Sequence, residues 1–297
     1  MKQIRIVLVL VSLISIIYSN PISWPYLPAN DYFRGTAGER LFFSFAKYNR
    51  GSFWINNDFR YYRFNHYWEV TGDKFECDPY SRLINIFSVG YLPFDKVQLS
   101  IRIPYVSLKN LNLANSGLSD IFIGFSCQMF ELSEKNNISF SSGIKIPVGY
   151  YKYDKNKLPL GTGSYDIPFI INSNFQKMSY QLFLDAGYIL IGKSEGIYPS
   201  YNVGKMFNNG DEIFFDIVLA KMTRIITFKL EANYYYVFSS EPDLGDWSDS
   251  QSKFSVTPGV ILPLPVTNFS LELSYTFDLF GKYTFSGSSP VIRICYF

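Results

Sequence analysis

Residues 269–279 read Phe-Ser-Leu-Glu-Leu-Ser-Tyr-Thr-Phe-Asp-Leu, and every second side chain in this stretch is apolar. The residues between them are serine, threonine, glutamate or aspartate. Successive side chains of a β-strand point to opposite faces, so the alternation predicts a strand with one apolar and one polar face. A helix would scatter the same residues around its circumference. The length also suits a strand that crosses a membrane at a tilt.

The same alternation recurs along the chain. It is clear at 97–105 and at 226–236, and weaker versions occupy 121–129, 138–148, 182–190 and 213–219. Aromatic residues make up 19% of the 297 residues and charged residues only 18%, yet no segment after the N-terminus is apolar throughout the length of a spanning helix. Alternating strands can present a lipid-facing surface without long apolar runs. We therefore expect an all-β fold, a single closed antiparallel transmembrane β-barrel.

The N-terminus has the pattern of a secretory signal peptide. A basic start is followed by an apolar stretch, Ile6–Ile17, that is broken only by serines, and Ser19 offers a cleavage position. The stretch is shorter than the ~20 residues that a spanning helix needs. We expect residues 1–19 to be a signal peptide and residues 20–297 to form the barrel. A retained helical anchor is the alternative.

Turn-forming residues separate the expected strands. Tight reversals are expected at 92–95, 134–137, 208–211 and 263–265, and longer polar connections at 65–80, 107–117, 150–163 and 239–251. In outer-membrane barrels the short turns are periplasmic and the longer loops extracellular, and a bacterial barrel closes with an even number of strands. We assign Tyr198–Phe207 to an extracellular excursion, predict about 12 strands, and keep about 14 as the alternative.

Six charged residues lie on the polar faces of these strands: Arg102, Lys145, Lys229, Glu231, Glu272 and Asp278. A charged side chain facing hydrocarbon costs ~2–4 kcal/mol near the midplane, so the apolar faces should contact lipid and the six charges should face the lumen. We expect charges from early and late strands to pair across the lumen and to narrow a passage that favours uncharged solutes.

The chain ends on a short β-prone segment, 290–297, that finishes with Phe297. It resembles the terminal strand through which outer-membrane proteins engage the barrel-assembly machinery. The face that carries Phe297, Cys295 and Val291 also carries Arg293. Either Arg293 snorkels towards an interface or the register of this strand differs.

Four short motifs follow one another in the first half of the chain: Leu-Ser-Ile-Arg-Ile-Pro-Tyr-Val at 99–106, Ser-Gly-Leu-Ser-Asp-Ile-Phe-Ile-Gly at 116–124, Gly-Ile-Lys-Ile-Pro-Val-Gly at 143–149 and Gly-Thr-Gly-Ser-Tyr-Asp at 161–166. This order resembles the outer-membrane family described as "Putative MetA-pathway of phenol degradation", mainly over residues 80–175. The resemblance implies a barrel related to channels that admit hydrophobic or aromatic small molecules. It implies no catalytic residues.

Glycine and aspartate recur together in two of these motifs, as Gly117 with Asp120 and as Gly161 and Gly163 with Asp166. Each group stands where a loop returns to an expected strand. We interpret both as turn geometry with a local hydrogen bond to the Asp side chain.

The residues that could support catalysis or metal binding are few. His66 is the only histidine and would have to serve any outer-membrane lipase as its base, but no Gly-x-Ser-x-Gly motif accompanies it. No catalytic, cofactor-binding or metal-binding residue is therefore predicted. The acids of the 239–251 connection, Asp243, Asp246 and Asp249, are interpreted as solvated loop residues rather than calcium ligands.

The three cysteines, Cys77, Cys127 and Cys295, are odd in number and far apart, which favours free buried thiols, although a pair that includes Cys77 remains an alternative. The net charge of +2 and the absence of a basic run argue against a nucleic-acid partner.

Taken together, these patterns predict an outer-membrane channel rather than an enzyme, with outer-membrane lipid around it and a small solute, hydrophobic or aromatic if the resemblance holds, inside it. A structural or adhesive barrel that transports nothing is the main alternative. An outer-membrane lipase and a secreted soluble β-sandwich, whose apolar faces would point inward, are the lesser ones.

Overall fold

The computed structural model describes residues 50–68, 71–110, 113–133, 136–151, 158–195, 206–208, 210–238, 250–264, 269–282 and 284–296. The expected signal peptide, residues 1–19, lies outside these residues, and so does Phe297.

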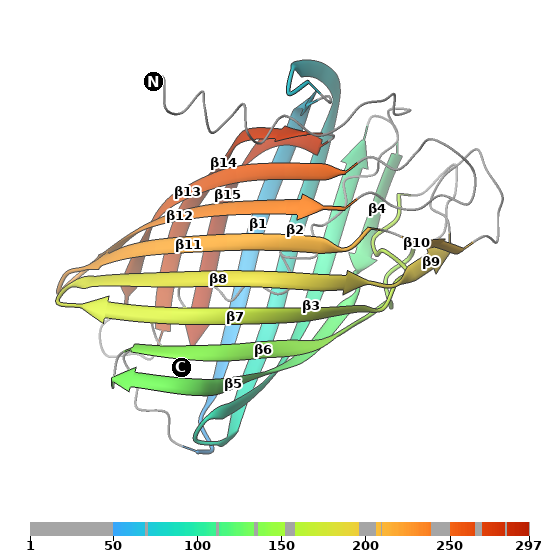
Figure 1. Ribbon diagram of the computed structural model, residues 1–297. Helices are drawn as coiled ribbons and strands as arrows, with labels where there is room; N and C mark the ends of the chain where they lie inside the picture. The colour runs from blue at the N-terminus through green and yellow to red at the C-terminus, as the bar shows by residue number, and fades with distance from the viewer. Residues whose placement is uncertain are drawn as a thin grey trace.

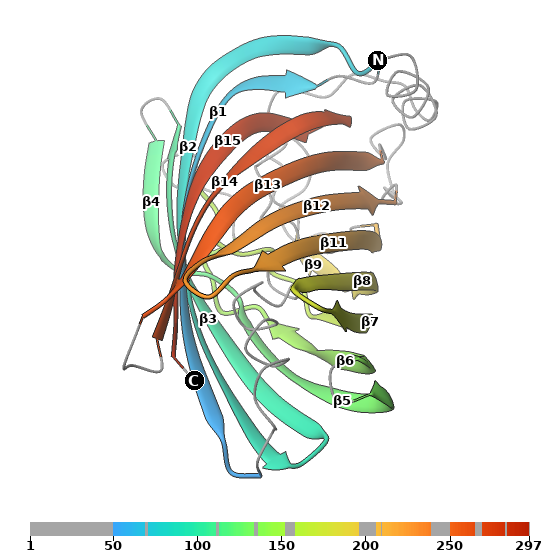
Figure 2. The ribbon, with the colours of Figure 1, turned by 90° about the vertical axis from the view of Figure 1, so that its left-hand side faces the viewer.

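The described chain folds into a closed wall of antiparallel strands (Figures 1 and 2). The strands are β1 Phe53–Trp68, β2 Lys74–Phe94, β3 Val97–Asn110, β4 Leu113–Leu118, β5 Ile121–Ser133, β6 Asn136–Ile146, β7 Asp166–Lys177, β8 Tyr180–Ile191, β9 Lys193–Glu195, β10 Met206–Asn208, β11 Glu212–Met222, β12 Thr227–Val237, β13 Gln251–Pro263, β14 Phe269–Lys282 and β15 Thr284–Tyr296. Their order around the wall is β2-β1-β15-β14-β13-β12-β11-β8-β7-β6-β5-β3-β4, and a pairing between β2 and β3 closes the ring.

The wall has 12 strands, as predicted. β4 pairs with the second half of β3 and β5 with the first half, so β4 and β5 together act as one wall strand that is interrupted at Ser119 and Asp120. β9 and β10 form a separate two-stranded sheet. The closed ring confirms the barrel and shows that the β-sandwich alternative is wrong.

Each stretch that the sequence marks as a strand lies in one, to within two residues at its ends. The first and last strands are neighbours: Ile55 lies opposite Tyr296, and Trp68 lies opposite Thr284. In Figure 1, β1 to β3 form the back of the wall behind β5 to β8 and β11 to β14. Among the described residues, no helix is long and apolar enough to span a membrane.

The two ends of the barrel differ in their connections. At one end, here called the turn rim, neighbouring strands are joined by 95–96, 134–135, 178–179, 223–226 and 264–268. At the other end, the loop rim, the connections are 69–73, 111–112, 147–165, 192–211, 238–250 and the single residue 283. Figure 1 shows the β7–β8 and β11–β12 hairpins at the turn rim and the small sheet of β9 and β10 at the loop rim.

Three expected connections are wrong. The stretches 65–80 and 107–117 are mostly strand, because the β1–β2 pairing continues to Trp68 opposite Lys74 and the β3–β4 pairing to Asn110 opposite Leu113. Ladder hydrogen bonds satisfy the backbone of such ribbons whatever the polarity of their side chains. The tight turn expected at 208–211 lies at the loop rim instead, where Asn208 pairs with Lys193. The connections expected at 150–163 and 239–251 do fall between strands, to within one residue.

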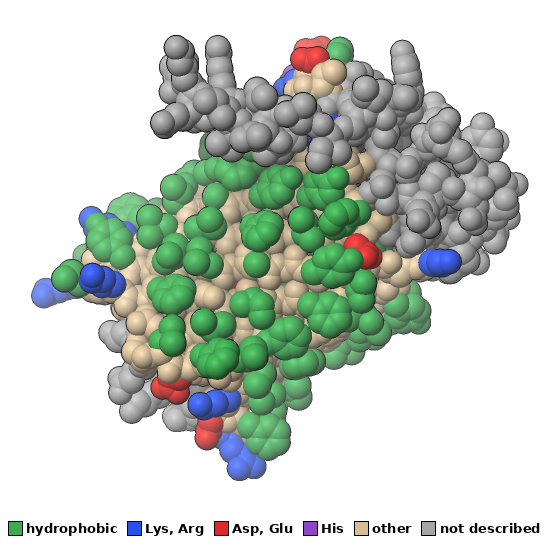
Figure 3. All heavy atoms as spheres, in the orientation of Figure 1, with side chains coloured by type: hydrophobic (Ala, Val, Ile, Leu, Met, Phe, Trp, Pro, Cys, Tyr) green, Lys and Arg blue, Asp and Glu red, His purple; other side chains and the backbone are tan. Residues whose placement is uncertain are grey.

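The outer face of the wall is apolar, and charged side chains gather towards its ends (Figure 3). On β14, Leu273 is 41% exposed and Phe277 45%, whereas Glu272 is 1% exposed. The alternation in the sequence thus separates an exposed apolar face from a buried polar one.

β15 shows which interpretation of Arg293 is correct. Val291, Arg293 and Cys295 are buried, while Ile292 and Ile294 are exposed. Arg293 donates hydrogen bonds to acids on both neighbouring strands. The register differs from that of the expected lipid-facing pattern, and the snorkelling interpretation is wrong.

Candidate functional site

The six charged residues singled out from the sequence are buried or nearly so. Arg102, Lys145, Lys229 and Glu272 are at most 8% exposed, and the side chains of Asp278 and Glu231 are 1% and 13% exposed. The structure brings Lys229, Glu231 and Glu272 together. Asp278 pairs with Lys253 on the adjacent strand, with 3.4 Å between Nζ and Oδ2.

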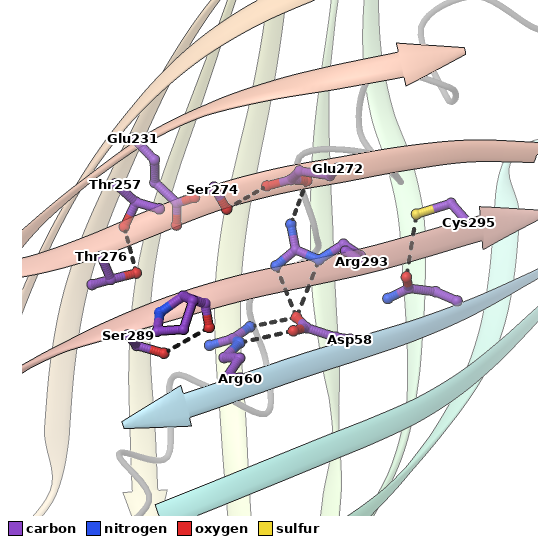
Figure 4. Close-up of polar contacts among 12 residues, drawn as sticks. Asp58, Arg60, Glu231, Thr257, Glu272, Ser274, Thr276, Ser289, Arg293 and Cys295 are labelled. Carbon is purple, nitrogen blue, oxygen red and sulfur yellow. Dashed lines mark hydrogen bonds and ion pairs between the residues drawn. The ribbon is translucent and has the colours of Figure 1, made fainter. Parts of the chain in front are cut away.

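Six charged side chains form a continuous chain of contacts, here called the wall network: Arg60, Asp58, Arg293, Glu272, Lys229 and Glu231. Arg293 lies at its centre, with Nη2 2.8 Å from Asp58 Oδ2 and Nη1 2.7 Å from Glu272 Oε2 (Figure 4). Arg60 Nη2 is 2.7 Å from Asp58 Oδ2, and Lys229 Nζ contacts Glu272 and lies 3.0 Å from Glu231 Oε2. Three cations thus balance three anions.

Strand register creates the centre of this network. Glu272 on β14 lies directly opposite Arg293 on β15, and Arg293 lies directly opposite Asp58 on β1. Residues in directly opposite positions share a face and have close Cβ atoms, so the ion pairs follow from the ladder. Removing one partner of a buried pair typically costs about 3–5 kcal/mol, because an uncompensated charge remains.

Gly259 lets the network cross β13. This glycine lies opposite Lys229 on β12 and opposite Ser274 on β14. A Cβ on Gly259 would lie 3.1 Å from Lys229 Cε and 2.5 Å from Ser274 Cβ. The missing side chain leaves the space through which Lys229 reaches Glu272.

A second cluster, here called the loop clasp, fixes the 147–165 connection: Asp120, Lys145, Thr162, Ser164 and Asp166. Lys145 Nζ contacts Asp166 and lies 3.6 Å from Asp120 Oδ2. Thr162 donates to Asp120 Oδ2 from its backbone N–H at 2.8 Å, and Ser164 Oγ donates to Asp166 Oδ1 at 2.7 Å. All five residues are at most 5% exposed. Lys145 therefore pairs with acids at the base of a loop, not with the acids of the late strands.

The hydrogen bonds of Asp120 are not local, which corrects the interpretation drawn from the sequence. Its partners include the backbone N–H groups of Gly149 and Thr162, 29 and 42 residues away along the chain. A Cβ on Gly161 would overlap the Asp120 carboxylate, so this glycine permits a close approach. Gly163 does adopt a left-handed turn conformation, with φ of 71°.

The loop clasp holds two leucines inside the barrel. Leu158 is fully buried and Leu160 is 9% exposed. They belong to one apolar cluster, here called the lumen cluster, with side chains from β1, β2, β3, β5, β7, β8, β11 and β12: Tyr62, Phe64, Tyr80, Ile84, Ile86, Val106, Leu108, Phe122, Ile170, Ile189, Ile191, Phe214 and Tyr235. Near the loop rim, the interior therefore contains apolar side chains packed around Leu158 and Leu160 of the described part of this loop.

Two cavities lie beside these groups. One, of about 30 Å³, is lined by parts of the wall network together with Asp278. The other, of about 180 Å³, is lined by β3, β5, β6, β7 and β8 and includes Arg102. Arg102 therefore lines the larger of these two cavities.

The remaining candidates are three cysteines, one histidine and three loop acids. Cys77, Cys127 and Cys295 form no disulfide; Cys295 is buried, with its Sγ 3.2 Å from Asn56 Oδ1, while Cys77 and Cys127 are half-buried. His66 Nδ1 lies 2.8 Å from the side-chain oxygen of its neighbour Asn65. Among the described residues, no group of three or more His, Cys, Asp or Glu side chains could hold a metal ion. Asp243, Asp246 and Asp249 lie outside those residues.

Comparison with known proteins agrees with the fold. A sequence profile of the family described as "Putative MetA-pathway of phenol degradation" matches residues 46–294. No curated protein matches the chain. The solved COG4313 outer membrane channel from Pseudomonas putida F1 superimposes with a TM-score of 0.74 and 10% identity, over 94% of this chain and 99% of that one.

Two further solved structures superimpose less well. The CymD monoaromatic hydrocarbon channel has a TM-score of 0.45 and 11% identity, over 91% of this chain and 93% of that one. The Ralstonia pickettii toluene transporter TbuX has a TM-score of 0.44 and 10% identity, over 84% and 90% of the two chains.

Proposed function

The chain belongs to the family described as "Putative MetA-pathway of phenol degradation", and we propose that it is an outer-membrane channel for small, uncharged, apolar or aromatic solutes. The six charged residues chosen from the sequence face the lumen in this proposal, and no residue acts in catalysis. The competing proposal is a structural or adhesive outer-membrane barrel that transports nothing.

One observation carries the proposal: part of the barrel interior is the apolar lumen cluster, and the charges of the wall network beside it balance one another. The wall network balances three cations with three anions, and the lumen cluster lies beside it. Pore selectivity depends on the groups that line the passage. An ion gains little from a lining whose charges are already paired, whereas an apolar solute gains contact with the lumen cluster.

Flux through reconstituted protein tests this function. Liposomes that contain the refolded barrel should accumulate radiolabelled toluene or benzyl alcohol faster than protein-free liposomes. The same barrel-containing liposomes should admit charged benzoate more slowly than toluene or benzyl alcohol. Because small apolar molecules also cross lipid unaided, the comparison must use the initial rate and thick, saturated bilayers. Equal rates with and without the barrel for every probe would support the structural or adhesive function instead.

Export and assembly are proposed from the two ends of the chain. Residues 1–19 act as a signal peptide, and the terminal strand that ends at Phe297 engages the barrel-assembly machinery. Deleting Phe297 should lower the amount of heat-modifiable barrel in outer membranes without changing the refolding of purified protein. A loss both of barrel in outer membranes and of refolding in vitro would mean that Phe297 stabilises the fold and is not needed for recognition by the assembly machinery.

A further inference from the structure

The cavity of about 180 Å³ opens between the lumen cluster and the turn rim. Its lining includes Phe122 and Ile170, which also belong to the lumen cluster, and extends to Asp95 and Lys96 in the β2–β3 turn. A solute that passed the inserted loop would enter this space next. The wall network lies elsewhere and is not part of its lining.

The cavity lining has buried apolar side chains at two places. Phe122, Ile170 and Phe183 line the cavity and are buried, with at most 6% of each residue exposed. Phe122 on β5 and Ile170 on β7 belong to the lumen cluster, whereas Phe183 on β8 belongs to a separate apolar cluster with Val218, Ala220 and Ile261.

Hydroxyls and amides make up much of the remaining lining. They occupy successive inward positions of four strands: Gln98 and Ser100 on β3, Ser126 and Gln128 on β5, Ser139 and Ser141 on β6, and Asn172 and Asn174 on β7. Two of these groups already bond to each other, since Ser141 Oγ donates to Asn172 Oδ1 at 2.6 Å. Serine, asparagine and glutamine can both donate and accept hydrogen bonds.

Size and charge narrow the ligand. An apolar cavity of ~150 Å³ can hold one benzene molecule, so this volume suits a single substituted six-membered ring. The charged residues in the lining are Asp95, Lys96, Arg102 and Asp185, two of each sign. The site therefore favours a ligand without net charge.

We propose that this cavity is a binding subsite for one neutral six-membered ring with a hydrogen-bonding substituent. The ring packs against Phe122 and Ile170, and the substituent exchanges hydrogen bonds with the serine and amide side chains. The subsite rests on the proposed function for its place on a solute route. Binding itself is measurable without any flux.

Equilibrium binding to the folded, detergent-solubilised barrel tests the subsite, with benzyl alcohol, toluene and benzoate as probes. Ligand-detected NMR with competition should show benzyl alcohol binding at least about fivefold more tightly than toluene, the difference expected of one net hydrogen bond. Benzoate should bind most weakly. Equal affinity for toluene and benzyl alcohol, or tighter binding of benzoate, would overturn the proposal.

Two variants locate the binding. Ser139→Leu should fill part of the cavity and weaken benzyl alcohol binding at least about tenfold, as expected when a bound ring is displaced by side-chain volume. Ser107→Leu is the matched control. It makes the same substitution on β3, on the face that points away from the barrel interior, and Ser107 is not part of the cavity lining. Unchanged binding in folded Ser139→Leu would refute the location.

The double variant Ser126→Ala with Ser139→Ala keeps the space and removes two hydroxyls. It should lower the preference for benzyl alcohol over toluene, and it carries the test if Ser139→Leu does not fold. Binding without flux in liposomes would leave the subsite in place and overturn the channel. Flux without saturable binding would leave the channel in place and overturn the subsite.

Discussion

Glu272 lies directly opposite Arg293 on the neighbouring strand, and its Oε2 atom accepts a hydrogen bond from Arg293 Nη1 at 2.7 Å. One position along the chain, Leu273 points to the other face and is 41% exposed. Neighbouring residues in the sequence therefore belong to different environments, one ionic and enclosed, the other apolar and outward.

Glu272→Gln should shift the ion preference of the barrel towards anions. The substitution removes one of three negative charges from the wall network and leaves Arg293 and Lys229 with less compensation. We expect a loss of stability of about 3–5 kcal/mol, because Arg293 and Lys229 keep buried charges that are no longer fully compensated. Reversal potentials in a salt gradient measure the preference. The control Glu131→Gln removes a half-exposed acid whose Oε2 is 3.8 Å from Lys96 Nζ, and it should change little.

Leu273→Glu should impair membrane insertion while Leu273→Ala should not. A carboxylate at this outward position would face hydrocarbon at a cost of up to about 2 kcal/mol, less than that of a cation at the same depth. The fraction of heat-modifiable barrel after refolding into liposomes reports the effect. Normal insertion of Leu273→Glu together with failure of Glu272→Leu would reverse the assigned faces.

Lys145→Met should release the inserted loop and increase conductance. The change leaves the buried carboxylates of Asp120 and Asp166 without their common cation, and such a broken pair costs about 3–5 kcal/mol. The loop can lower that cost by moving its leucines out of the lumen. Single-channel recordings should show larger or more frequent openings than in Lys109→Met, which removes an exposed lysine. Unaltered conductance in a folded variant would mean that the loop does not obstruct the passage.

Gly259→Ala should destabilise the barrel less when Lys229 is already shortened. The added Cβ meets Lys229 Cε and Ser274 Cβ, so part of its cost comes from displacing the lysine. A double-mutant cycle with Lys229→Ala, which removes the Cε atom, followed by urea unfolding in detergent, should give a coupling of about 0.5–3 kcal/mol. Strict additivity would show that Lys229 does not depend on the missing side chain.

The sequence predicts the late half of the barrel better than the early half. In 269–279 the apolar and polar sets separate cleanly, so the strand, its faces and the burial of Glu272 follow from period alone. In β1 the buried set mixes Trp54, Asp58, Arg60 and Phe64, while the other set includes Asn57 and Arg63. Neither set is uniformly apolar, so the sequence of β1 shows no alternation of apolar and polar residues. The inward direction of Asp58 and Arg60 could therefore not be predicted.

Two other features depend on contacts that are distant in sequence. The β7–β8 hairpin turns at Met178 and Ser179, with φ of 54° at Met178, and methionine is not a usual marker of such a turn. Leu158 and Leu160 stand in a polar connection, and only the closed wall shows that they are enclosed. Apolar residues within an otherwise polar loop are the signal that could have pointed to its insertion.

Because Ile55 lies opposite Tyr296, the ladder of paired strands continues without a break from the last strand, β15, to the first, β1. A circular permutant that joined these ends by a linker and opened the chain between Met178 and Ser179 would keep every strand pairing. Its last strand would be β7, and its terminal aromatic residue would be lost. Such a permutant should refold in detergent with the same yield as the natural chain. Its assembly in cells would depend on whether the barrel-assembly machinery recognises β7 as the last strand.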